Sequence, residues 1–141
     1  MQFWPLYFLL MLTLGCARPD YIKAEENISE STQKPTSECH YKLPRKNLCF
    51  EVLWNSAPTS NNYAEFEISF SEPVDGELLV KLWMPSMGHG SAPVTLIPIS
   101  RKLFTISRVY FIMPGEWEIR ISLRNSQGEL EDQFNLPVLV P

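Results

Sequence analysis

Apolar and polar side chains alternate along this chain from about residue 40 to its end. In residues 65–70 three apolar side chains, Phe66, Ile68 and Phe70, alternate with Glu and Ser, and residues 117–123 repeat the pattern. A period of two predicts strands with one buried face. Further apolar runs that we expect to form strands are residues 48–54, 78–84, 94–97, 104–111 and 134–140.

Turn-forming residues separate these runs, at residues 56–62, 73–76, 114–115 and 125–128. About seven strands over roughly a hundred residues predict an all-β fold, an immunoglobulin-like β-sandwich. Pro98 and Pro137 lie inside apolar runs, and proline cannot donate a hydrogen bond to a neighbouring strand. We therefore expect these two strands to be edge strands or to be bulged.

The N-terminal segment differs from the rest of the chain. Residues 1–15 carry no charge, and their apolar run at residues 6–12 is too short to span a bilayer. This length is typical of a signal peptide, and the Gly-Cys that ends at Cys16 resembles a bacterial lipobox. We expect residues 1–15 to be a lipoprotein signal and Cys16 to be acylated with chains such as palmitate. The alternatives are an uncleaved anchor or ordinary cleavage with loss of Cys16.

Residues 16–38 are polar and show no periodic pattern. Such a composition offers little to bury, so we expect a flexible tether between the lipid and a domain formed by residues 39–141. The protein would then lie in the cell envelope, anchored to a membrane and facing the periplasm or the exterior.

The cysteines agree with export from the cytoplasm. If Cys16 carries lipid, Cys39 and Cys49 are left to pair with each other. Residues 44–47 between them are turn-like and could bring them within disulfide reach. A disulfide would indicate an oxidising compartment. The alternative is two reduced thiols.

Charge and the residue types present limit the function classes. The net charge is −4, which makes nucleic acid a poor partner, and membrane attachment would come from lipid and not from a basic helix. The chain has two His and no evident nucleophile with an adjacent base, so we do not expect an enzyme. The oligomeric state is left open.

The segment from Met84 to Gly90 concentrates unusual chemistry. It holds Met84, Met87 and His89, with Pro85 expected to end the preceding strand. Met113 stands before a second turn. Thioether and imidazole groups are ligands that Cu(I) prefers. We predict a Cu(I) site of Met84, Met87, His89 and Met113. The alternative is that Met84 and Met113 fill the core and that Met87 and His89 are exposed loop residues.

Two motifs resemble a known family. Residues 82–90, Leu-Trp-Met-Pro-Ser-Met-Gly-His-Gly, and residues 110–119, Tyr-Phe-Ile-Met-Pro-Gly-Glu-Trp-Glu-Ile, are similar to the signatures of YtkA-like and FixH-like domains. The resemblance covers residues 48–123. It implies an exported or membrane-anchored β-sandwich that is related in fold to copper-carrying proteins.

Two functions remain in view at this point. The first is a lipid-anchored extracytoplasmic domain that binds or delivers Cu(I) through the Met and His loop. The second is a protein-interaction or structural module of the envelope that uses the sandwich edge or loops and holds no metal. In that case the Met-rich loop serves only as an apolar contact.

Overall fold

The computed structural model describes residues 39–141. The expected signal peptide at residues 1–15, the lipid site at Cys16 and the tether at residues 16–38 lie outside the described residues. The described strands are β1 (Tyr41–Leu43), β2 (Leu48–Ser56), β3 (Ala64–Phe70), β4 (Glu77–Met84), β5 (His89–Gly90), β6 (Thr95–Pro98), β7 (Leu103–Val109), β8 (Gly115–Arg124) and β9 (Leu130–Val140).

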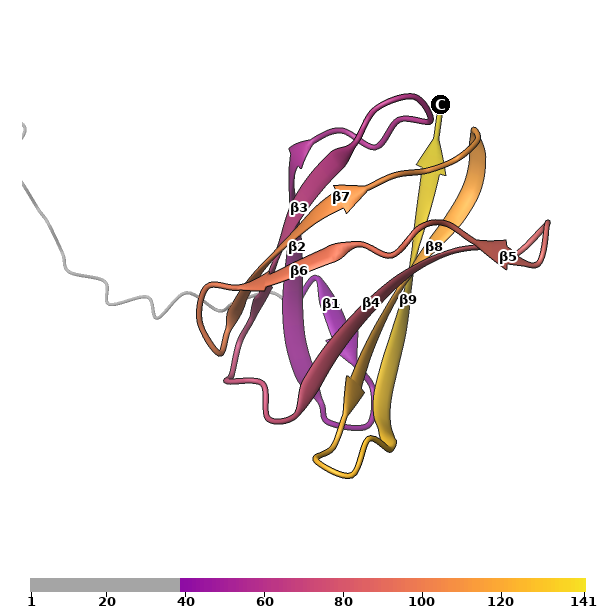
Figure 1. The fold of residues 1–141 in the computed structure, drawn as a ribbon. Helices are drawn as coiled ribbons and strands as arrows, with labels where there is room; N and C mark the ends of the chain where they lie inside the picture. Colours follow the sequence, from indigo (N-terminus) through magenta and orange to yellow (C-terminus); the bar gives the residue numbers. More distant parts are fainter. Residues whose placement is uncertain (1–38) are drawn as a thin grey trace, which may run out of the picture. The chain divides into compact units, whose positions relative to one another are not determined.

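These strands form two antiparallel sheets (Figure 1). The first has the order β1-β2-β3-β7-β6, and the second has the order β5-β4-β8-β9. The expected all-β sandwich is therefore confirmed, while the finer immunoglobulin-like connectivity stays a prediction. Residues 39–141 form nine strands where about seven were expected. The strands β1 and β5, of three and two residues, are too short for an alternation of apolar and polar residues to be recognised in the sequence.

The core is built from the alternating side chains that the sequence pattern singles out. In β3, Phe66, Ile68 and Phe70 are buried, and in β8 every second residue from Trp117 to Leu123 is at most 1% exposed. A shift of one residue in either strand would turn all of these side chains to the solvent. Burial of the apolar faces between the two sheets thus sets the register of the strands.

Strand β7 contains a bulge and ends two residues earlier than predicted. The run at residues 104–111 was expected to be one strand, but β7 ends at Val109 and its pairing with β3 is irregular at this end. Arg108 has a positive φ of 56°. The inserted residue changes the phase of the alternation, so that Phe104 and Ile106 are buried before it and Val109 after it.

The two prolines within apolar runs occupy edge strands, as predicted. Pro98 is the last residue of β6 and Pro137 lies in β9, and each of these strands is the outermost of its sheet. On an edge strand the missing N–H can face away from the neighbouring strand, so it need not remove a ladder hydrogen bond.

A buried carboxylate, which the sequence analysis did not single out, fastens one side of the sandwich. Asp132 is 1% exposed, and its Oδ2 accepts hydrogen bonds from the backbone N–H of Arg45 at 2.9 Å and of Lys46 at 2.8 Å. Its Oδ1 accepts one from the N–H of Gln133 at 2.9 Å. The β1–β2 turn is thereby attached to β9.

We expect Asp132→Ala to lower the free energy of unfolding by about 2–4 kcal/mol, because the backbone N–H groups of Arg45 and Lys46 lose their acceptor and the buried side chain is removed. The measurement is chemical denaturation followed by tryptophan fluorescence. Asp75→Ala is the matched control, since the Asp75 side chain is 79% exposed in its ion pair with Arg101 and should change stability by less than about 1 kcal/mol. Equal losses in the two variants would contradict the role of Asp132.

Candidate metal centre

The Met and His segment forms a short hairpin at one end of β4. The strand ends at Met84, as expected from Pro85, and β5 returns so that Met84 lies directly opposite His89. The Met84 carbonyl accepts hydrogen bonds from the N–H of Met87 at 3.2 Å and of Gly88 at 3.0 Å. In Figure 1 this hairpin projects from the sandwich at the right of the view.

Met84 and His89 present their side chains on one face of the hairpin. Directly opposed residues of an antiparallel pair share a face, with Cβ atoms about 4.5–5.5 Å apart. That face is turned to the core, because Met84 is only 5% exposed. The His89 ring is half-buried, and its centroid lies 6.3 Å from that of Trp117 in an edge-on arrangement. A thioether and an imidazole are therefore neighbours at this end of the sandwich.

A hydrogen bond at His89 leaves one ring nitrogen for a metal. The Nδ1 atom lies 3.1 Å from the carbonyl oxygen of Gly90. A carbonyl oxygen can only accept, so this hydrogen bond requires a proton on Nδ1 and leaves Nε2 of the neutral ring unprotonated. Metal-binding His residues commonly have this arrangement, in which the other nitrogen donates to a carbonyl.

Gly115 makes room for the Met84 side chain. A Cβ atom added to Gly115 would lie 2.7 Å from the Met84 Cε, and Gly115 has a φ of +133°. The first residue of β8 therefore lies against the thioether at the end of β4. This contact follows from the pairing of the two strands, in which Trp83 is opposite Glu118.

Met113 reaches the same end of the molecule from another part of the chain. It precedes β8 by two positions, is half-buried and packs against the core. Its carbonyl accepts a hydrogen bond from the Trp117 Nε1 at 3.0 Å, which holds the turn before β8. Met113 thus lies in the turn that leads to Gly115, the residue that contacts the Met84 side chain.

Met87 is placed differently from the other three predicted ligands. It lies in the β4–β5 turn, and its side chain is 58% exposed. The fold therefore gathers Met84 and His89, brings Met113 to the same end, and leaves the Met87 thioether at the surface.

Trp117 belongs to this end of the sandwich as well as to the core. Trp117 was expected in a strand and in the second motif, and the structure adds its contacts with His89 and with the Met113 carbonyl. Its ring also packs on Phe111, with centroids 5.4 Å apart. The sequence signal was the spacing Met-Pro-Gly-x-Trp, which sets Trp117 four residues after Met113.

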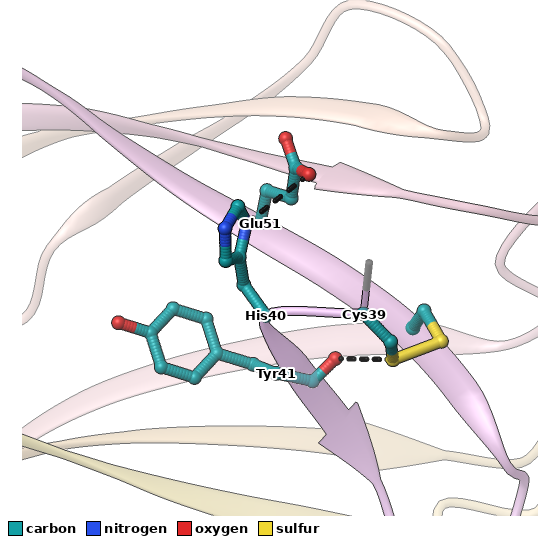
Figure 2. The surroundings of a disulfide bond; sticks show 5 residues. Cys39, His40, Tyr41 and Glu51 are labelled. Carbon is teal, nitrogen blue, oxygen red and sulfur yellow. Dashed lines mark hydrogen bonds and ion pairs between the residues drawn. A yellow bond between two sulfur atoms is a disulfide. The ribbon is translucent and has the colours of Figure 1, made fainter. Parts of the chain in front are cut away.

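The disulfide lies on a different pair of strands (Figure 2). Cys39 and Cys49 are bonded, with Cα atoms 5.3 Å apart, and the bridge closes the β1–β2 hairpin. In Figure 2 the His40 ring turns to the Glu51 carboxylate, with Nδ1 and Oε1 3.2 Å apart. Sulfur atoms in a disulfide are not thiolates, so in this state the bridge supplies no metal ligand.

Residues 39–141 contain no group of three or more His, Cys, Asp or Glu side chains placed to hold a metal ion. Over the same range, no helix is long and apolar enough to cross a membrane.

Comparisons with known proteins found no matching family model, curated protein or solved structure. The resemblance to YtkA-like and FixH-like domains therefore rests on the two sequence motifs and stays a prediction.

We expect Gly115→Ala to lower the free energy of unfolding by about 1–3 kcal/mol, through an unfavourable φ and the contact with Met84. Gly128→Ala is the matched control, because Gly128 also has a positive φ but has nothing within 4 Å of an added Cβ. Thermal denaturation of both variants gives the comparison. The Gly115 change should also cost less in a Met84→Ala background. If it costs no more than Gly128→Ala, Met84 does not press on Gly115.

Proposed function

We propose that this protein is a lipid-anchored extracytoplasmic domain that binds Cu(I) and delivers it to a partner. The observation that carries the proposal is the placement of Met84 opposite His89, with the Nε2 of His89 left free by the hydrogen bond to Gly90. Met113 would be the third ligand and the exposed Met87 the fourth.

The donor set fits Cu(I) better than harder ions. Thioether sulfur is soft and neutral, and imidazole suits copper, whereas Ca²⁺ and Mg²⁺ prefer oxygen. Structural zinc sites use thiolate, imidazole or carboxylate and not thioether. A thioether also needs no deprotonation before it binds Cu(I).

The difference in exposure between Met84 and Met87 supports delivery over permanent storage. Met84 is buried, while Met87 in the turn is 58% exposed. A ligand at the surface can bind an incoming ion first, or remain bound while a partner replaces the buried ligands. Removal of Met87 should therefore change the rate of Cu(I) exchange more than it changes the geometry of the buried ligands.

The compartment is inferred from the cysteines. The Cys39–Cys49 disulfide agrees with an oxidising environment outside the cytoplasm. The lipid anchor at Cys16 is proposed from the lipobox-like sequence, and it would hold the domain at a membrane of the envelope, facing the periplasm or the exterior.

The full chain in mild detergent should bind Cu(I) in competition with a chromophoric Cu(I) chelator. We expect the Met87→Ala, His89→Ala double variant to bind at least about tenfold more weakly, because two of the proposed ligands are lost. His40→Ala is the matched control, since His40 is exposed on another part of the sandwich and pairs with Glu51. A double variant with the affinity of the parent would rule out the site.

We expect Cys16→Ala to abolish incorporation of labelled palmitate in a bacterial host and to remove the protein from the membrane fraction. The measurement is metabolic labelling followed by fractionation. Cys49→Ala is the control, because it removes a cysteine of the sandwich that is not proposed to carry lipid and should leave labelling unchanged. Labelled palmitate in the Cys16 variant would contradict lipid attachment at this residue.

A further inference from the structure

The β4 strand has an open edge along most of its length. The two-residue strand β5 covers only Trp83 and Met84. Just before them, the Leu82 carbonyl accepts a hydrogen bond from the N–H of Ser91 at 3.4 Å. Alternate residues of a strand direct their backbone groups to the same side, so Val80 and Leu78 direct theirs to this edge as well. Within residues 39–141 no strand pairs with them there.

A groove of about 540 Å³ follows this edge. One wall is the stretch of β4 from Leu78 to Trp83, and the other is formed by residues 90–94 and by Leu96 of β6. Because both faces of β4 contribute to the wall, the groove runs along the strand's edge and not over one face. Both β4, beyond the short β5, and β6 lie at the open side of their sheets.

The opposite side of the sandwich is closed. There the Asp132 carboxylate holds the β1–β2 turn to β9, and the rings of Tyr41 and Phe134 pack with centroids 5.6 Å apart. The open β4 edge is therefore a particular feature of one side of the fold. An uncovered edge readily pairs with an additional strand.

The charge of the groove is opposite to that of the chain. Its lining contains Lys81 and Arg120 and no carboxylate, whereas the whole chain carries a net charge of −4. Lys81 and Arg120 are directly opposite in the pairing of β4 with β8, and like charges so placed are destabilising. Arg120 pairs with Glu118 at 3.0 Å, while Lys81 has no ion-pair partner among the described residues. An anionic occupant would offset this repulsion.

We propose that the β4 edge binds an extended, acidic segment of a partner protein as an added strand. Its backbone would pair with Leu78 and Val80, apolar side chains at every second position would enter the groove, and a carboxylate would face Lys81. A second copy of this chain fits less well, since joining two β4 edges would bring two Lys81 and Arg120 pairs together. This interaction does not depend on Cu(I).

The test uses a fluorescein-labelled eight-residue peptide in which Val alternates with Asp and Thr, titrated with the full chain in mild detergent. Fluorescence anisotropy should show binding. A peptide with Lys in place of Asp tests the charge, and one with N-methyl groups on the edge-facing amides tests the backbone pairing. We expect each of these two modified peptides to bind at least about tenfold more weakly than the parent peptide. Absence of binding, or equal binding of the N-methyl peptide, would overturn the proposal.

Variants of the protein test whether the peptide binds at β4. Lys81→Glu should weaken the parent peptide about tenfold, by replacing an attraction with a repulsion. Lys42→Glu is the matched control, because it makes the same charge change on the exposed face of β1, and it should bind as the parent does. Cu(I) affinity should be the same in both variants, which separates this proposal from the copper site. Concentration-dependent dimers of the unmodified chain, together with no binding of the peptide, would overturn the partner proposal in favour of self-association.

Discussion

The antiparallel pairing of β4 with β8 is the constraint on which the arrangement of this protein depends. It joins the two central strands of one sheet, and its register sets Leu82 opposite Ile119 and Trp83 opposite Glu118. The end of β4 is thereby brought to the beginning of β8. The contact of Gly115 with the Met84 side chain depends on this register. The register holds because a shift would expose the core faces of both strands.

The two open sides of a β-sandwich are treated differently in this protein. One is closed by a buried carboxylate and an aromatic contact, which both join the β1–β2 hairpin to β9. The other is left with a free strand edge, a groove and two cations in register. Proteins commonly cover or charge such edges to prevent unwanted pairing, and Lys81 can serve in this way until an acidic partner arrives.

The two interpretations of Met84 that the sequence left open, core residue or ligand, are not exclusive in the folded chain. Its side chain is buried against Gly115 and at the same time lies on one face with His89. Packing limits the rotamers of a flexible thioether, and a ligand held in this way loses less conformational entropy when it binds an ion. The exposed Met87 has no such restriction, which is why we assign it to exchange.

The all-β class, the main strands with their buried faces, and the edge positions of Pro98 and Pro137 could be predicted from the sequence, because they depend on local alternation and on proline's missing N–H. The sequence also singled out Met84 and His89, which lie close together along the chain. The pairing of the strands, the positions of β1 and β5, and the contact of Gly115 with Met84 come from the folded structure alone. The reason is distance along the chain. Asp132 accepts a hydrogen bond from Arg45, 87 residues away, and no local pattern encodes such a contact.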